Sequence, residues 1–174
     1  MRTSLALLLL ASLTLTACGG TTTEAPQPTD AGDQTMSAEE ALILQQVNEA
    51  RAQSRRCGDV SFAATTPVTW NGFLAAAARA HADDMATRGY FEHLSPEGED
   101  MQARAEAAGY TNWRELGENL ATGHAGADVM AAWLASESHC RTIMNPKFRE
   151  LGVGYVNRPG SVGVTYWVQV FGTR

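Results

Sequence analysis

The hydrophobic and polar positions divide the chain into three stretches of different character. An apolar run occupies residues 5–13, directly after a short N-terminal segment that carries Arg2. Residues 21–33 are rich in Thr, Pro and Asp and contain no large apolar side chain to bury. From Ser37 onward aliphatic and aromatic residues recur, so we expect residues 37–174 to form one domain with a core of its own.

The domain should open with a helix. Ser37 followed by Glu40 has the spacing of a capping box, and apolar residues follow it at helical intervals. The first helix is therefore predicted to run from about residue 38 to residue 54. Residues 67–70 follow as an extended segment.

A second, alanine-rich helix is predicted between Asn71, which is placed to cap its start, and Gly89, which is placed to end it. Its apolar positions recur every four residues, at Phe73, Ala77, His81 and Met85. Because this spacing places His81 on the buried face, we expect a structural role for His81 rather than a chemical one.

Two further helices are predicted in the second half of the domain. One covers about residues 100–108 and is closed by Gly109, and residues 113–120 after it are extended or turning. The other begins after Gly126 and should end before Asn145, since Pro146 follows and disfavours helix in the residue before it.

The C-terminal part has the pattern of a β-hairpin. Residues 151–156 and 162–171 are rich in β-branched and aromatic side chains, and residues 157–161 between them contain Pro and Gly. Helices first and a hairpin last favour an α+β layered domain over a parallel α/β fold.

The N-terminus has the pattern of an export signal. The apolar run is followed by Leu15-Thr16-Ala17-Cys18 and then by glycine, which resembles the lipobox of bacterial lipoproteins. We predict a signal peptide at 1–17, acylation of Cys18, and a flexible tether at 18–36. A transmembrane helix is the alternative, but the run is shorter than the roughly 20 residues a membrane span needs.

The remaining cysteines, Cys57 and Cys140, are predicted to form a disulfide, because an exported domain meets an oxidising environment. Closing so long a loop would stabilise the fold by roughly 4 kcal/mol on the chain-entropy model. Metal ligation by these cysteines is the alternative, but the chain lacks the close Cys-x-x-Cys spacing of such sites.

The formal net charge is −6 at pH 7, and positive charge is nowhere concentrated along the sequence. A nucleic-acid partner is therefore not expected. The expected partners are the membrane, through the lipid anchor, and a ligand outside the cytoplasm. We expect a monomer at the cell envelope, and the choice between inner and outer membrane stays open.

Several short motifs occur in an order that resembles the CAP superfamily, the domain of cysteine-rich secretory proteins, venom allergens and pathogenesis-related proteins. The resemblance covers nearly all of residues 38–174. It rests on Asn48-x-x-Arg51, Ala80-His81-Ala82-x-x-Met85-Ala86, Phe91-x-His93-x-Ser95-Pro96-x-Gly98, Gly117-Glu118-Asn119-Leu120-Ala121, Trp133-x-x-Ser136-x-x-His139, Ile143-Met144-Asn145-Pro146, Leu151-Gly152-Val153-Gly154 and Tyr166-Trp167-x-Gln169-x-Phe171.

The resemblance implies a three-layer α-β-α sandwich with a central antiparallel sheet and a shallow cleft. Members with the full site gather two histidines and two glutamates in that cleft. Here His93 and Glu118 match one of each, whereas Ser136 stands where the second glutamate would fall and the second histidine would fall near Tyr166. The expected cleft residues are His93, Glu118, Ser136, His139, Tyr166 and Gln169.

A partial metal site is one interpretation of these residues. His139 lies three residues after Ser136, on the same face of a predicted helix, and would supply a third ligand beside His93 and Glu118. Two imidazoles and one carboxylate are sufficient for Zn²⁺ with an open water position. The alternative is that His93 and Glu118 only hydrogen-bond each other and fix two loops. His124, in a glycine-rich loop, is expected to be exposed.

Three functions are compatible with the sequence. The preferred one is a non-catalytic module at the cell envelope that binds a lipid, a glycan or a protein, since the chain has no evident catalytic triad and no free thiol. The second is a metal-assisted hydrolase with His93, Glu118 and His139 as ligands, or with Glu118 as a general base. The third is a structural envelope protein.

Overall fold

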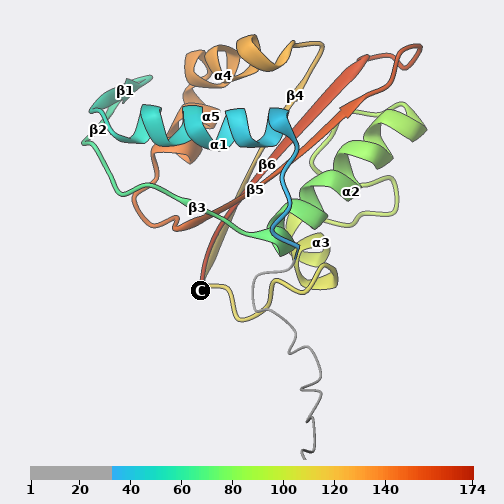
Figure 1. The fold of residues 1–174 in the computed structure, drawn as a ribbon, viewed down its shortest axis with the longest axis horizontal. Helices are drawn as coiled ribbons and strands as arrows, with labels where there is room; N and C mark the ends of the chain where they lie inside the picture. The colour runs from blue at the N-terminus through green and yellow to red at the C-terminus, as the bar shows by residue number, and fades with distance from the viewer. Residues whose placement is uncertain (1–32) are drawn as a thin grey trace, which may run out of the picture.

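A four-stranded sheet lies at the centre of the structure, a computed structural model that describes residues 33–174 (Figure 1). Its strand order is β3-β5-β6-β4, with bounds Thr69–Trp70, Glu150–Asn157, Thr165–Thr173 and Glu115–Thr122 in that order. The predicted signal peptide, the predicted acylation site Cys18 and most of the predicted tether lie outside the described residues.

Strands β4, β5 and β6 pair antiparallel, so the predicted hairpin and the central antiparallel sheet are confirmed. The short β3 differs, since it pairs with β5 in parallel through Thr69 and Trp70. The segment that forms β3 was predicted to be extended, and it is extended. The parallel direction of its pairing differs from the antiparallel sheet that the family resemblance implies. Strand β4 forms one edge of the sheet, and this edge carries the candidate site.

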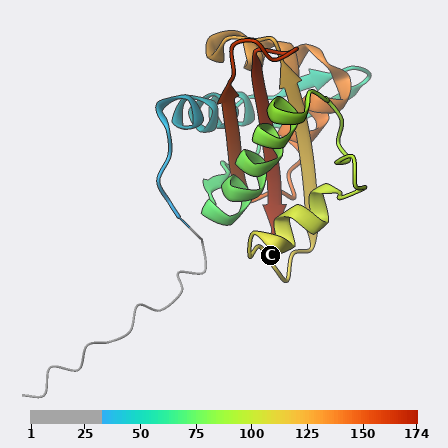
Figure 2. The same ribbon diagram turned by 90° about the vertical axis from the view of Figure 1, so that its right-hand side faces the viewer.

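Helices cover both faces of the sheet, as an α-β-α sandwich requires (Figure 2). Helices α1 (Ala38–Arg51), α4 (Gly126–Ala135) and α5 (Glu137–Met144) pack on one face. Helices α2 (Gly72–Arg88) and α3 (Met101–Ala107) pack on the other. The α+β class and the three-layer architecture are therefore confirmed.

The predicted helix caps are present. The Ser37 hydroxyl accepts from the Glu40 amide and the Glu40 carboxylate accepts from the Ser37 amide, which completes the capping box of α1. The Asn71 side chain accepts from two amides at the start of α2, and Gly89 ends α2 with a φ of 72°. Helix α1 ends at Arg51, a few residues before the predicted position.

The alanine-rich sequence of α2 allows a close approach to the sheet. A Cβ atom on Gly152 or Gly154 of β5 would lie 2.1 or 2.3 Å from the nearest backbone atoms of α2. The glycines of the Leu151-Gly152-Val153-Gly154 motif are therefore required by the distance between helix and strand. His81 is 1% exposed on this helix, as predicted.

The helix predicted from Gly126 to Asn145 is broken. Ser136 has an extended ψ of 126° and separates α4 from α5, although the amide of Ser136 still donates to the carbonyls of Ala132 and Trp133. Trp133 before the break and Cys140 after it are both buried. The prediction that Ser136 and His139 share one continuous helix is therefore wrong.

The Cys57–Cys140 disulfide is confirmed, with 5.5 Å between the two Cα atoms. It joins α5 to a small hairpin that the sequence pattern did not reveal, formed by β1 (Arg55–Cys57) and β2 (Val60–Phe62). The hairpin strands have three residues each, too short for an alternating pattern to be recognised.

Arg51 of the Asn48-x-x-Arg51 motif is fully buried, and no carboxylate among residues 33–174 pairs with it. Its guanidinium donates to four backbone carbonyls, those of Thr66, Ile143, Asn145 and Phe148, at 2.7–3.1 Å. Burial lowers the pKa of Arg51 to about 10. The motif thus ties α1 to the segments that lead into β3 and β5.

Candidate functional site

The candidate site lies along the edge strand β4, where consecutive side chains point to opposite faces of the sheet. Glu118 points toward α3 and pairs with Arg104 there. Asn119 points the other way, and its amide donates to the carbonyl of His139 on α5. The edge therefore brings together groups from both helical layers.

The carboxylate of Glu118 is held by two cationic or polar partners. Nδ1 of His93 lies 2.7 Å from Oε1, and Nη2 of Arg104 donates to Oε2 at 2.9 Å. The side chains of Glu118 and Arg104 are only 3% and 8% exposed, whereas that of His93 is 60% exposed. The hydrogen bond to Glu118 raises the pKa of His93. The pairing of His93 with Glu118 is thus a loop contact of the kind the sequence left open.

Arg104 is the residue of this site that the sequence did not identify. Besides Glu118, its guanidinium donates to the carbonyls of His93 and Glu99, so it holds both ends of the loop that carries His93. Arg104 lies in a short helix among alanines, and no local motif distinguishes it from a surface arginine. Only the tertiary contact between α3 and β4 reveals its role.

His139 and Ser136 line a cavity of about 280 Å³ at the strand edge, which we call the edge cleft. Its remaining lining residues are Phe91, Leu120, Ala121, Thr122, His124, Ala132 and Trp133. Burial, and after it the nearby His93, lowers the pKa of His139. The edge cleft thus combines an apolar floor with imidazole and hydroxyl groups.

Tyr166 and Gln169 do not lie in this cleft, although the sequence placed them there. Tyr166 is buried in the core beneath α2, and its hydroxyl accepts from the amide of Gly163. Gln169 is fully buried beside Asn119, whose amide donates to its oxygen at 3.0 Å. Tyr166 and Gln169 are three positions apart on β6, so their side chains point to opposite faces of the sheet and do not share one site.

His124 is half-buried rather than exposed, and its backbone carbonyl makes hydrogen bonds to two residues of β6. Its carbonyl accepts from the hydroxyl of Thr165 and from the indole of Trp167. These bonds fix the loop between β4 and α4 against the start of β6.

The donor set of the site does not fit a divalent metal. Within residues 33–174, no three His, Cys, Asp or Glu side chains form a group that could hold a metal ion. Both oxygens of Glu118 are engaged, and the charge of Arg104 lies where a cation would have to approach. The expected grouping of His93, Glu118 and His139 around zinc is therefore not what the structure presents.

The arrangement also lacks a paired nucleophile and base. Cys57 and Cys140 are oxidised to a disulfide. The hydroxyl of Ser136 contacts that of Ser138 at 3.3 Å and makes no hydrogen bond to His139. Among the described residues the edge cleft thus offers recognition groups without an activated nucleophile.

Fold and site together define an α-β-α sandwich module whose edge strand carries a His93–Glu118 pair and lies beside a cleft lined by His139. The sequence profile of the CAP family, the cysteine-rich secretory protein family, matches residues 44–171. The chain belongs to this family.

Two solved structures share the fold with a TM-score of 0.65 each. An outer surface protein from Borrelia burgdorferi is 18% identical, with 82% of this chain and 98% of that protein covered. An extracellular SCP-domain protein from Bacillus anthracis is 24% identical, with 87% of this chain and 45% of that one covered.

Among curated proteins, the uncharacterized protein YkwD of Bacillus subtilis is 30% identical over 151 residues. The match covers 86% of this chain and 53% of YkwD, so the chain spans about half the length of this relative. In the part of the chain from residue 33 onward, none of the helices has the length and apolar character needed to cross a membrane.

Proposed function

We propose that this protein is an exported, lipid-anchored CAP module that binds the apolar part of a lipid in the edge cleft and performs no catalysis itself. The observation that carries the proposal is the lining of the edge cleft. Phe91, Leu120 and Trp133 provide apolar surface, whereas His139 and Thr122 provide polar groups around it.

The character of this lining favours a lipid over a glycan. Small-molecule sites are mostly apolar with a few polar groups that orient the ligand, and the edge cleft has this composition. Phe91 of the cleft is 42% exposed and Leu94 on the same loop is 54% exposed, so this loop presents apolar side chains to solvent. An acyl chain buries such surface, at about 0.8 kcal/mol per methylene.

The proposed absence of catalysis follows from how Glu118 is held. A general base must reach a substrate proton or a water molecule, but both oxygens of this carboxylate are bonded to His93 and Arg104. We therefore assign Glu118 to positioning the His93 loop beside the edge cleft.

The proposed location rests on two features of the chain. The lipobox at Cys18 predicts acylation, and the Cys57–Cys140 disulfide is of the kind that persists outside the reducing cytoplasm. The fold is shared with an outer surface protein of Borrelia burgdorferi and an extracellular protein of Bacillus anthracis. A flexible tether of about 20 residues would have a root-mean-square span of roughly 25 Å, which places the domain close to its own membrane.

Lipid capture tests the proposal directly. The purified protein is incubated with vesicles of phosphatidylcholine and phosphatidylglycerol, and bound lipid is measured by native mass spectrometry. Ala132→Trp, which fills the edge cleft, should abolish capture, whereas Ala135→Trp, at an exposed position of α4 outside the cleft, should leave it intact. The proposal is wrong if the unmodified protein captures no lipid, or if both variants capture it equally.

A further inference from the structure

Exposed apolar side chains gather at the end of the molecule where the turn between β5 and β6 meets the loop after α2. Among residues 33–174, seven large apolar side chains are exposed, and four of them lie in these two segments. Val162 and Val164 on the turn are 91% and 46% exposed, and Phe91 and Leu94 lie on the loop. We call these four residues the apolar tip. Figures 1 and 2 both show the turn and the end of α2 at the same end of the molecule.

The turn and the loop lie side by side. Phe91 of the loop and Val162 of the turn line one small cavity of about 140 Å³, which Thr122 of β4 also lines. Arg158 at the start of the turn pairs with Asp83 of α2 at 2.7 Å, so the turn is also tied to the helix that precedes the loop. The two segments therefore present their apolar side chains on one surface.

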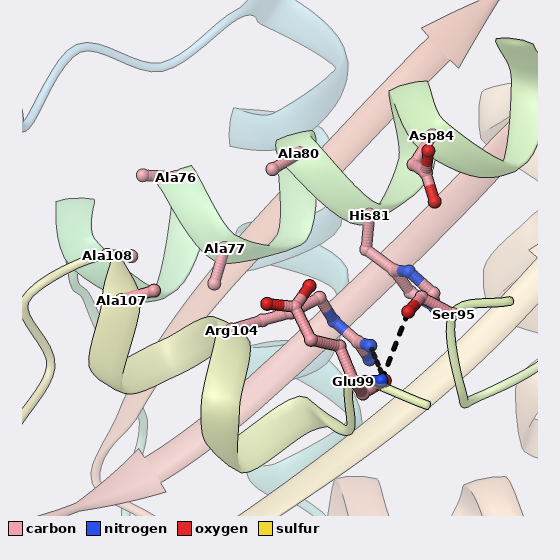
Figure 3. Close-up of a pocket in the computed structure, with 10 residues that line it drawn as sticks. All are labelled: Ala76, Ala77, Ala80, His81, Asp84, Ser95, Glu99, Arg104, Ala107 and Ala108. Atoms are coloured by element: carbon pink, nitrogen blue, oxygen red, sulfur yellow. Dashed lines mark hydrogen bonds between the residues drawn. The ribbon is translucent and has the colours of Figure 1, made fainter. Parts of the chain in front are cut away.

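The loop projects from a fixed base. Arg104 donates to the carbonyls of His93 and Glu99, and the hydroxyl of Ser95 accepts from the amide of Glu99. Figure 3 shows the two bonds to Glu99, which close the loop at its junction with α3. Because these bonds hold the inner part of the loop, its outer part presents apolar side chains in a defined position.

The turn keeps a backbone conformation that valine rarely adopts. Val164 has a φ of 59°, in the left-handed region that disfavours β-branched side chains. Its amide donates to the carbonyl of Ser161, and its carbonyl accepts from the amide of Arg158. Strained backbone of this kind persists where the surrounding structure determines it, often at binding sites. A structured turn that exposes two valines is therefore a candidate contact surface.

The apolar tip carries little charge. Residues 158–164 contain one cation, Arg158, which pairs with Asp83, and no acidic residue. On the loop, Glu97 pairs with Arg88. Surfaces that recognise anionic lipids carry clusters of Lys and Arg, which residues 89–98 and 157–164 lack. The tip is therefore suited to the apolar region of a bilayer rather than to a charged partner.

The predicted anchor and the apolar tip can reach the same bilayer. The described chain begins at Asp33, whose backbone lies against Gly72 at the start of α2, whereas the tip lies beyond the end of α2. With 17 residues, α2 is about 25 Å long. The 14 residues between Cys18 and Asp33 span up to about 50 Å when extended. A chain anchored at Cys18 is therefore long enough for the tip to contact the membrane that holds the anchor.

From these observations we infer that the apolar tip docks into the phospholipid bilayer that carries the anchor, and that lipid passes from there into the edge cleft. The cavity at the tip and the edge cleft share Phe91 and Thr122 in their linings, so the docked surface leads to the cleft. Side chains that enter the interface gain by leaving water, as those of interfacial membrane segments do. The passage of lipid rests on the proposed function, whereas the docking requires only that the protein is held at a membrane.

A fluorescent label at the tip measures the docking. The chain from residue 18 onward, with Cys18→Ser and an N-terminal His tag, is held on phosphatidylcholine vesicles by a nickel-chelating lipid, so that the result does not depend on acylation. Cys18→Ser removes the one cysteine outside the disulfide, and Val162→Cys then takes a nitrobenzoxadiazole label. Val60→Cys on β2 is the matched control, because Val60 is also an exposed valine.

The label at residue 162 should shift its emission to the blue and lose most of it when the vesicles contain a lipid with a nitroxide on its acyl chain. The label at residue 60 should keep its emission. Absence of quenching at residue 162, or equal quenching at the two positions, overturns the docking.

A second pair of variants tests whether the loop docks together with the turn. Leu94→Asp should reduce the quenching at residue 162 several-fold, because it places a charge in the apolar interface. Leu42→Asp, at an exposed leucine of α1, should leave the quenching unchanged. Raising the salt from about 0.1 to 1 M, which shortens the Debye length from about 10 to 3 Å, should change it little. Equal effects of the two variants, or loss of quenching at high salt, contradict docking through apolar contacts.

Lipid capture separates the docking from the proposed function. Val162→Asp should slow the capture of lipid from vesicles several-fold and leave the binding of dissolved, monomeric dihexanoylphosphatidylcholine unchanged, because Val162 does not line the edge cleft. A label that inserts while no lipid of either form is bound would refute the edge cleft and retain the docking. Normal capture from vesicles by Val162→Asp would refute the passage of lipid through the tip.

Sedimentation velocity addresses the other possible occupant of the tip, a second copy of the chain. The unmodified protein should sediment as a monomer. A dimer that Val162→Asp dissociates would assign the tip to self-association and overturn the membrane assignment.

Discussion

The two faces of the central sheet differ in what holds their helices in place. On the face of α1, α4 and α5, the large buried side chains Trp133, Trp167 and Phe171 pack with a disulfide and with the buried guanidinium of Arg51. On the face of α2 and α3, helix contacts are made largely by alanines, and ion pairs at Glu118 and Arg88 tie the His93 loop.

This difference indicates a division of roles between the two layers. Fully packed side chains, buried hydrogen bonds and a disulfide contribute most of the stability, and they lie mainly on the first face. The His93–Glu118 pair belongs to the second face, and the edge cleft lies at the strand edge beside Trp133. We therefore expect substitutions on the first face to change stability most, and those near Glu118 to change loop position and binding.

Arg51→Met should have the largest effect on stability. It leaves the carbonyls of Thr66, Ile143 and Asn145 without a side-chain donor and removes one of the two donors to Phe148, so the free energy of unfolding should fall by about 5 kcal/mol. Urea denaturation measures the change. Arg56→Met, which removes one exposed bond to Gly58, should cost less than about 0.5 kcal/mol. Similar losses in both variants would contradict the special role of Arg51.

Removing the disulfide should have the next largest effect. The bond closes a sequence separation of 83 residues, so Cys57→Ala together with Cys140→Ala should lower the free energy of unfolding by about 4 kcal/mol on the chain-entropy model. Comparing urea midpoints of this double variant and the oxidised protein measures the loss. An unchanged midpoint would show that the first face does not depend on the disulfide.

Glu118→Gln should destabilise the second face by a smaller amount, about 3 kcal/mol, because it leaves the buried charge of Arg104 without its counter-charge. The variant should also free the His93 loop, which hydrogen exchange at residues 91–95 would detect as lower protection. A loss as large as that of Arg51→Met would mean that the two faces do not differ as described.

The smallest effect concerns pH and distinguishes His93 from His139. The raised pKa of His93 means that its bond to Glu118 stabilises the fold below the ordinary histidine pKa of about 6.5 and is lost as pH rises through the raised value. The lowered pKa of His139 has the opposite sign, since protonation below about 6.5 opposes folding. The exposed His93 should contribute less than about 1 kcal/mol.

Proton NMR titration of the two imidazoles checks these directions. His93 should titrate above His139, and Glu118→Gln should lower the midpoint of His93 while that of His139 changes little. A His93 midpoint that does not respond to Glu118→Gln would show that this contact does not form in solution.

Local sequence signals predicted much of the fold. The capping box at Ser37 predicted the start of α1, and the Asn71 cap and Gly89 predicted the two ends of α2. These positions were predicted accurately because each signal acts within one helical turn. The break at Ser136 could not be predicted, because the flanking residues have helical character and the interruption accompanies the burial of both Trp133 and Cys140. The short β1–β2 hairpin carries too few residues for a pattern.

The candidate site was predicted only in part, for a related reason. The motifs located His93, Glu118 and His139, and the pairing of His93 with Glu118 was one of the alternatives the sequence left open. Arg104 was missed because its contact with Glu118 joins α3 to β4, and nothing in α3 alone indicates it. Gln169 was misplaced because a strand motif does not state which face its residues cover.

The most direct test of a cleft that binds its ligand without a metal is zinc titration of the purified protein, followed by elemental mass spectrometry after dialysis. With Glu118 held by Arg104, we predict no stoichiometric zinc in the unmodified protein and no difference from His93→Ala or His139→Ala. About one zinc per chain, lost in both variants, would contradict this view and establish a metal site in the cleft.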